Sequence, residues 1–107
     1  MNISDDYIVE FTEECTKEIK KIYEYIKYNF YLENTASSIM IEIEEKVNNL
    51  KRYPKMYNEV DKYKDMYRKY RKIVVKNYIL LYTIDENNKK IYISHMYYGG
   101  SNYLNKI

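Results

Sequence analysis

The first third of the chain carries a hydrophobic pattern that predicts a strand followed by a helix. Residues 7–11 are mostly β-branched or aromatic, which is typical of a short strand. Thr12 follows as a suitable N-cap, and the acidic residues after it favour the positive end of a helix. Apolar residues then recur at steps of three and four, which predicts an amphipathic helix. Its apolar positions are Cys15, Ile19, Ile22, Ile26 and Phe30.

A second stretch with the same spacing predicts another helix directly after the first. Its apolar positions run from Ala36 to Leu50, and we expect Asn34 or Thr35 to cap it. The helix must end before Pro54, since proline cannot continue a helix. Two helices joined by a turn of a few residues should pack antiparallel as a hairpin.

The second half of the chain changes to the pattern of strands. Residues 55–67 follow neither period, and we interpret them as a loop with some local helix. Tight polar turns then separate three β-branched, aromatic segments. These predicted strands are 70–75, 78–84 and 91–97. The order β-α-α-β-β-β predicts one α+β domain, residues 1–107, in which the helical hairpin packs on one face of an antiparallel sheet.

Composition excludes several classes of protein. The chain has 107 residues with 46% hydrophobic and 32% charged residues, which is globular rather than disordered composition. The single cysteine, Cys15, excludes an intrachain disulfide and a cysteine-based zinc site, and we expect a buried, unreactive thiol. No run approaches the ~20 apolar residues of a membrane span. We expect a cytoplasmic protein without metal ion, cofactor or membrane partner.

Charge is small in total but unevenly distributed. The net charge of +2 argues against a general nucleic-acid coat, whereas residues 62–76 alone carry +6. This basic stripe is compatible with one anionic partner surface. The candidate binding residues are Lys69, Arg71, Lys72 and Lys76.

The order of elements and several sequence stretches resemble the RelE/ParE superfamily of toxins from type II toxin–antitoxin modules. The most specific stretch, 70–85, reads Tyr-Arg…Val-Val-x-Asn-Tyr…Tyr-x-x-Asp. The other matching stretches are 7–14, 19–26, 43–54 and 91–99. The resemblance implies a growth-inhibiting toxin with a cognate antitoxin as its partner. It leaves the target open, because one branch cleaves messenger RNA on the ribosome and the ParE-like branch poisons DNA gyrase.

The ribonuclease branch needs groups that move protons and cations that stabilise the phosphorane. Its members use Lys and Arg on the first two strands after the helices, and Arg with Tyr or His near the C-terminus. The residues that match under this alternative are Arg71, His95, Tyr98 and Tyr103, with Tyr97 as a further proton-transfer candidate. A structural role is the alternative for two of them: Arg71 would pair with a helix Glu, and His95 would be a hydrogen-bonded strand residue.

The ribonuclease pattern has cations at three places, namely the two strands and the C-terminal tail, and two of these places lack them. The position after Tyr78 is Ile79, and residues 98–103 read Tyr-Gly-Gly-Ser-Asn-Tyr where the pattern has two arginines. Neighbouring lysines cannot restore the bidentate phosphate contact of Arg.

Three hypotheses follow from these observations. A ParE-like toxin that binds gyrase is slightly favoured over a ribosome-dependent endoribonuclease, and a non-toxic antitoxin-binding homologue is the third. Antitoxins of this type carry an acidic, apolar segment that folds on the toxin. We expect that segment to cover the apolar helical hairpin and the charges of Lys69, Arg71 and Lys72.

Overall fold

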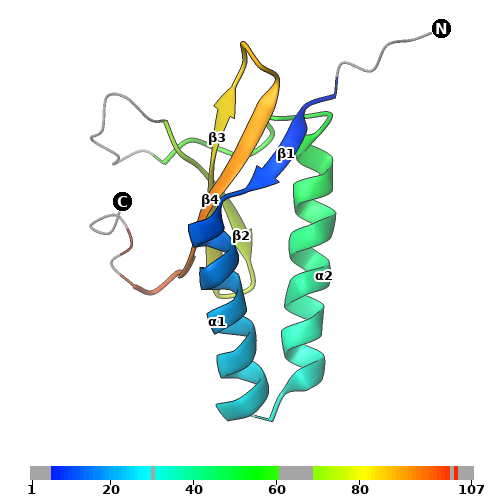
Figure 1. Cartoon of the computed structure of the whole chain (residues 1–107). Coiled ribbons are helices and arrows are strands. Elements are labelled where there is room, and N and C mark those ends of the chain that lie inside the picture. The colour runs from blue at the N-terminus through cyan, green and yellow to red at the C-terminus, as the bar shows by residue number, and fades with distance from the viewer. Residues whose placement is uncertain (1–5, 30, 61–68, 102, 104–107) are drawn as a thin grey trace, which may run out of the picture.

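The computed structural model describes residues 6–29, 31–60, 69–101 and 103, and shows two helices beside a twisted four-stranded sheet (Figure 1). The elements, in chain order, are β1 (Ile8–Phe11), α1 (Glu13–Asn29), α2 (Glu33–Leu50), β2 (Arg71–Val75), β3 (Tyr78–Asp85) and β4 (Lys90–Tyr98). The α+β class and the order of elements are therefore confirmed. None of the helices in these ranges has the length and apolar character needed to cross a membrane.

The two helices begin in different ways. At α1 the predicted cap is confirmed, because the Thr12 side chain accepts a hydrogen bond of 3.1 Å from the Cys15 amide. The predicted cap of α2 at Asn34 or Thr35 is wrong, since the helix begins at Glu33 and no side chain caps it. The tight connection starts this helix instead: the Leu32 carbonyl accepts the amide of Ala36.

The sheet has the order β1-β4-β3-β2. Strands β2, β3 and β4 form the predicted antiparallel meander, whereas β1 pairs with β4 in parallel, so the sheet is mixed rather than wholly antiparallel. The helical hairpin explains this difference. Its two antiparallel helices return the chain to the start of β1, where the Tyr7 amide donates to the Lys51 carbonyl at 2.7 Å, and β2 and β4 then run in the same direction as β1.

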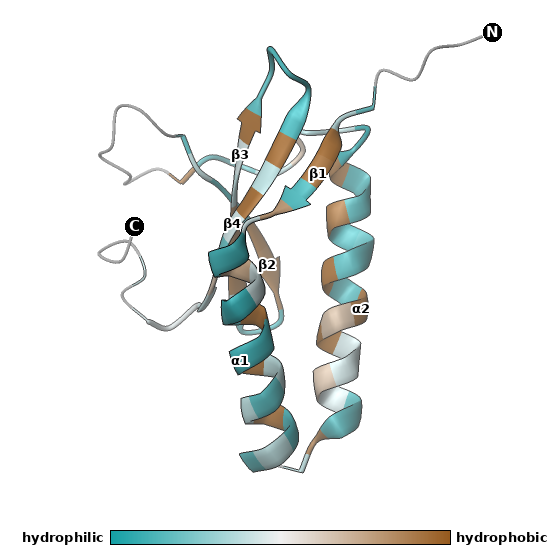
Figure 2. Ribbon diagram, viewed as in Figure 1, coloured by the Kyte–Doolittle hydropathy of each residue, from teal (hydrophilic) through white to brown (hydrophobic). Residues whose placement is uncertain are grey.

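One face of the sheet and the helical hairpin enclose the main core. The apolar stripes of α1 and α2 alternate with hydrophilic positions, as Figure 2 shows. The fully buried side chains of this core include Cys15, Leu50, Ile73, Leu80 and Ile93. Burial, with the nearby carboxylates of α1, raises the pKa of the Cys15 thiol to about 12, so the prediction of an inert core thiol is confirmed.

A second, smaller apolar cluster lies on the opposite face of the sheet. Its buried residues are Tyr70, Ile79 and Leu81, and partly buried side chains from the flanking segments pack against them. The segment before β2 contributes Val60 to this cluster. Residues 55–60 of the loop predicted at 55–67 form turns and an isolated bridge between Glu59 and Arg71, without the local helix that was expected. Residues 61–67 of that predicted loop, and 104–107 of the tail, lie outside the described residues.

Candidate functional site

Strand alternation places the predicted site residues on different faces of the sheet. Arg71 is on the face that carries the main core, together with Ile73 and Val75. His95 pairs in register with Leu81 of the opposite cluster. Because neighbouring residues of a strand point to opposite faces, Arg71 and His95 cannot act on one atom from these positions.

Arg71 is held by the segment that precedes β2. Its Nη1 donates a hydrogen bond of 2.7 Å to the Tyr57 carbonyl and a longer one of 3.5 Å to Lys55, and its Nη2 lies 3.5 Å from Glu59 Oε1. Only 17% of the side chain is exposed. The ion-pair partner is thus a residue outside the helices, and not the helix Glu that the structural alternative predicted.

His95, Tyr97 and Tyr103 form a stack on the face opposite the helices. The rings of His95 and Tyr97 are 5.3 Å apart and nearly parallel, and the Tyr97 hydroxyl lies within hydrogen-bond distance, 3.1 Å, of His95 Nδ1. Tyr103 stacks on Tyr97 at 6.4 Å, and the Tyr70 ring lies 6.1 Å from His95. The predicted candidates His95 and Tyr103 are therefore brought together, with Tyr97 between them.

Tyr97 is poorly suited to act as a base in this stack. Burial, the charges of Glu18 and Glu14 and a hydrogen bond with Glu18 raise the pKa of the Tyr97 hydroxyl to about 12. The phenol consequently stays protonated at neutral pH.

Tyr98 points to the helix-covered face, because it follows Tyr97 directly on the same strand and successive side chains alternate. Its ring meets that of Tyr78 edge to face at 6.0 Å, and 56% of the residue is exposed. Gly100 passes so close that an added Cβ would lie 2.6 Å from the Tyr98 ring. A side chain at this position, where the ribonuclease pattern has Arg, would therefore force Tyr98 to move.

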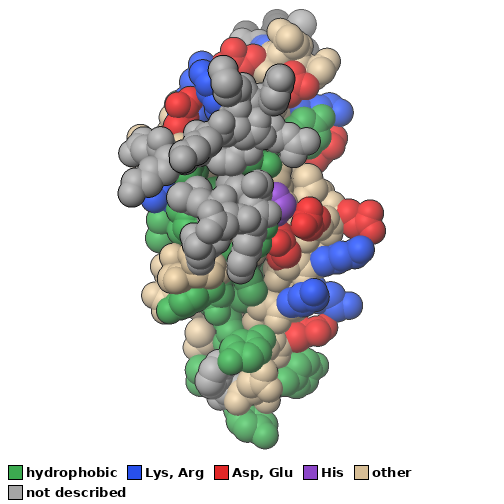
Figure 3. Space-filling model, turned by 90° about the vertical axis from the view of Figure 1, so that its left-hand side faces the viewer, with side chains coloured by type: hydrophobic (Ala, Val, Ile, Leu, Met, Phe, Trp, Pro, Cys, Tyr) green, Lys and Arg blue, Asp and Glu red, His purple; other side chains and the backbone are tan. Residues whose placement is uncertain are grey.

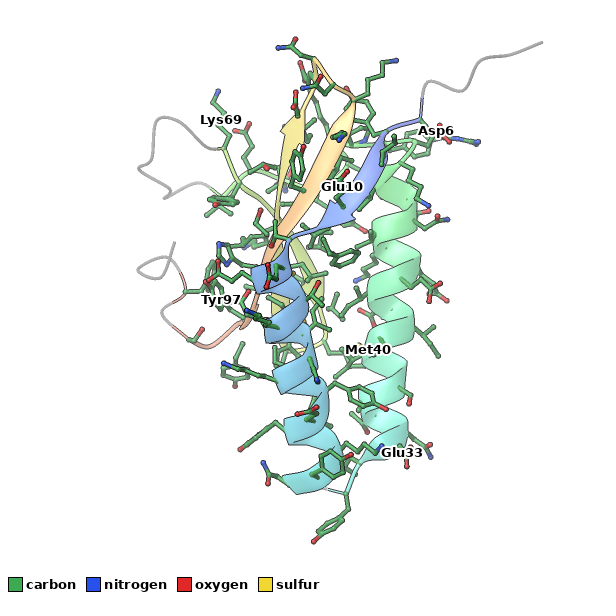
Figure 4. The ribbon with its side chains drawn as sticks, in the orientation of Figure 1. Asp6, Glu10, Glu33, Met40, Lys69 and Tyr97 are labelled. Atoms are coloured by element: carbon green, nitrogen blue, oxygen red, sulfur yellow. The ribbon has the colours of Figure 1, made fainter. Side chains whose placement is uncertain are left out.

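The predicted basic stripe is also divided. Lys76, in the tight turn between β2 and β3, pairs with Glu42 of α2 at 3.6 Å, and Arg71 is engaged as described. Lys69 and Lys72 form no ion pair within the described part of the chain, and Figure 4 shows Lys69 on the side of the molecule away from α2. Residues 62–68 of the stripe lie outside the described residues, and among the four candidates Lys69 and Lys72 are the two without an ion pair in the described part.

Two acidic residues of α1 belong to the surroundings of His95 and were missed in the sequence analysis. Glu18 Oε1 accepts the Met96 amide at 3.2 Å and lies 3.5 Å from His95 Nδ1. Glu14 lies one turn before it on α1, and Figure 3 shows the chain's one His beside acidic side chains. The four-residue spacing of Glu14 and Glu18 indicates that both lie on one side of α1. The sequence did not reveal that this side of α1 lies along the edge of β4.

The comparison with protein families decides the membership of the chain. The sequence model of a family described as the ParE toxin of the type II toxin–antitoxin system parDE matches residues 9–103. The chain belongs to this family. It matches none of the curated proteins with which it was compared. The predicted superfamily, and the role as toxin of a toxin–antitoxin pair, are confirmed.

A second surface of this ParE-family toxin is an apolar groove between β1 and the helical hairpin. Its volume is about 410 Å³. Val9 and Phe11 line it from β1, Ile19 lines it from α1, and Met40 and Val47 line it from α2 (Figure 4 labels Met40). Since β1 is an edge strand, both the groove and the free strand edge are open to a partner.

Proposed function

We propose that this ParE-family toxin inhibits growth by binding DNA gyrase and that it does not cleave RNA. The observation that carries the proposal is the position of Arg71. The residue that matches the one remaining catalytic cation of the ribonuclease branch is tied to Tyr57 and Glu59 on the helix-covered face, away from His95 and Tyr97.

The separation of Arg71 from His95 matters because RNA cleavage needs several catalytic groups at the same place. A base, an acid and a cation must all reach the same phosphate and ribose, and each typically contributes 10²-fold or more to the rate. Arg71 and the His95 stack satisfy this only if the segment around Tyr57 releases the guanidinium. Such a release would break a hydrogen bond of 2.7 Å to a partly buried carbonyl.

The positions of the missing cations support the same conclusion. Ile79, which stands where the pattern has Arg on the second strand, is 8% exposed and packs in the cluster of Tyr70 and Leu81. At Gly100 a side chain would require the exposed Tyr98 ring to move. Ile79 thus packs in the sheet in place of a phosphate contact.

One observation favours the ribonuclease as the second candidate. The stack of His95, Tyr97 and Tyr103 is an aromatic platform with an imidazole, and Lys69 and Lys72 carry free positive charge. Aromatic side chains and cations of this kind bind single-stranded nucleic acid by stacking and by phosphate contact. The catalytic candidates under this reading are His95 and Tyr97, with Tyr103 beside them.

We further propose that the antitoxin inserts an apolar segment into the groove between β1 and the hairpin. Exposed Phe11 and the apolar side chains of α2 provide the contact, in line with the apolar hairpin surface expected from the sequence. Of the basic stripe, Lys69 and Lys72 remain available for the acidic part of the antitoxin. Replacing both by Glu should weaken the complex, whereas a change at Arg71 would also disturb the fold.

The deciding experiment compares two activities of one purified preparation. The toxin, released from its antitoxin, is added to gyrase with plasmid DNA and to a translating ribosome extract. We expect trapped gyrase–DNA cleavage complexes and intact ribosome-bound message. Message cleavage that is lost in Tyr97→Phe and His95→Gln would replace the proposal with the ribonuclease alternative.

Both assays need one further control. Expression of the chain without antitoxin should arrest growth, and coexpression of the antitoxin should relieve the arrest. A well-folded product that is harmless and inactive in both assays would contradict the proposal and identify a non-toxic antitoxin-binding homologue.

A further inference from the structure

We propose that Glu14, Glu18 and His95 form a binding site for one divalent transition-metal ion of the Zn²⁺ class. One donor atom from each of the three side chains lies within 4.8 Å of the other two. The sequence alone predicts no metal site, and its single cysteine excludes a cysteine-based zinc site. The site arises only in the fold, where α1 lies along β4.

The three donors come from two elements that are fixed relative to each other. Glu14 and Glu18 are four residues apart, so they occupy adjacent turns on one side of α1. Glu18 is anchored to β4 by the hydrogen bond from the Met96 amide. His95 is only 9% exposed, and its ring is held between Tyr70 and Tyr97. Two of the donors are therefore preorganised, and the exposed Glu14 is free to turn towards them.

Electrostatics favour a cation at this place. Within the described ranges no Lys or Arg forms an ion pair with Glu14 or Glu18, and the neighbouring Lys17 pairs with Glu13 instead, at 3.3 Å. Two carboxylates thus stand next to an imidazole without compensating charge. A divalent ion would neutralise both carboxylates and use the imidazole as a neutral ligand.

The donor set determines the class of metal ion. Imidazole with carboxylates suits Zn²⁺ and similar ions, which bind these groups at about 2.0–2.2 Å. Donors at such bond lengths lie roughly 3.5 Å apart in a tetrahedron, so the present spacing requires a small inward rotation of the carboxylates. An ion bound through His95 Nδ1 would displace the Tyr97 hydroxyl, which lies 3.1 Å from this nitrogen. By joining α1 to β4, the ion would stabilise the folded chain.

The test titrates Zn²⁺ into the purified full chain by calorimetry and follows the melting temperature. We expect one ion per chain and a higher melting temperature with Zn²⁺, both reversed by a chelator. Glu14→Gln should weaken binding by about tenfold or more, since even the loss of an outer-shell partner of a metal ligand costs 10–100-fold. Its melting temperature without metal should stay unchanged, because Glu14 is exposed.

The matched control is Glu24→Gln, which removes one exposed carboxylate from the same helix, outside the cluster and outside the Glu13–Lys17 ion pair. It should bind Zn²⁺ like the unchanged chain. Absence of any Zn²⁺ binding, or equal weakening by both substitutions, would overturn the proposal. The outcome is independent of the gyrase assay, because the proposed toxicity does not require the metal.

Discussion

The two faces of the sheet are built from neighbouring residues of the same strands but have different surroundings. The face with Leu80 and Tyr82 is sealed by both helices and belongs to the main core. Among the described residues, short flanking segments and tyrosine side chains cover the opposite face, which carries Leu81 and His95. Packing fixes the first face, whereas the second holds the polar and aromatic groups that are available for binding.

This difference explains how similar residue types acquire different roles. Arg71 and Tyr98 point to the helix-covered side, and their neighbours Lys72 and Tyr97 point to the other. Residues that are adjacent in a sequence motif can therefore lie on opposite faces of the sheet. The comparison between the faces can be tested with pairs of adjacent residues.

The largest effect is expected for Leu80→Ala. Leu80 is fully buried in the main core, so its truncation should lower the free energy of unfolding by about 3–5 kcal/mol, including the cost of the cavity. Leu81→Ala should cost less, about 2 kcal/mol, because the partly buried side chains around it can collapse into the space. Urea denaturation of both variants measures the difference. Equal losses would show that the two faces are packed equally tightly.

The next pair is Arg71→Ala and Lys72→Ala. Removing Arg71 leaves the Tyr57 carbonyl and Glu59 without their partner, and should cost about 2–3 kcal/mol of unfolding free energy. Lys72 forms no ion pair with the described residues, so Lys72→Ala should stay within about 0.5 kcal/mol. The proposed gyrase activity should survive Arg71→Ala at temperatures where the variant is folded. A loss of activity without a loss of stability would contradict the structural role of Arg71.

The fold followed from the sequence because its signals are local and repeated. Apolar periods of three to four predicted α1 and α2, and the Thr12 cap was confirmed. The start of α2 was not predictable from side chains, since the turn geometry at Tyr31 and Leu32 starts this helix. The parallel pairing of β1 was likewise hidden, because it joins segments that are about 80 residues apart in sequence.

The candidate site was predicted only in part. His95 and Tyr103 were named and do lie near each other, on either side of Tyr97. Tyr98 was chosen by its place in a motif, and alternation turns it to the other face. Glu18 was missed because its contact with Met96 depends on how α1 lies against β4, which no period in the sequence encodes.

Alkaline pH provides a test of burial on the helix-covered face. Burial raises the pKa of Tyr82 to about 12 from its ordinary value of 10.0. Because the folded pKa is the higher one, this stabilisation is complete below pH 10 and is lost as the pH rises towards 12. The loss of unfolding free energy over this pH range is about 2–3 kcal/mol.

The variant Tyr82→Phe isolates this contribution from that of the other tyrosines. It loses the hydrogen bond of 2.7 Å to the Pro54 carbonyl, which should cost about 1 kcal/mol at neutral pH. Above pH 10 the advantage of the unchanged chain should shrink and then reverse, because a Phe has no proton to lose. Unfolding free energies measured from pH 8 to 12 give the two profiles. Parallel profiles would contradict the burial argument.

The smallest effect separates the adjacent residues Tyr97 and Tyr98. Tyr97→Phe removes the hydroxyl that bonds to His95 Nδ1, and should lower the unfolding free energy by about 1 kcal/mol. Tyr98→Phe should change it by less than about 0.5 kcal/mol, because more than half of Tyr98 is exposed. Growth arrest should persist in both variants, since neither hydroxyl moves a proton in a gyrase-binding toxin. If Tyr97→Phe alone lost toxicity while remaining stable, the face with His95 would carry out chemistry. The view that this face only binds a partner would then be wrong.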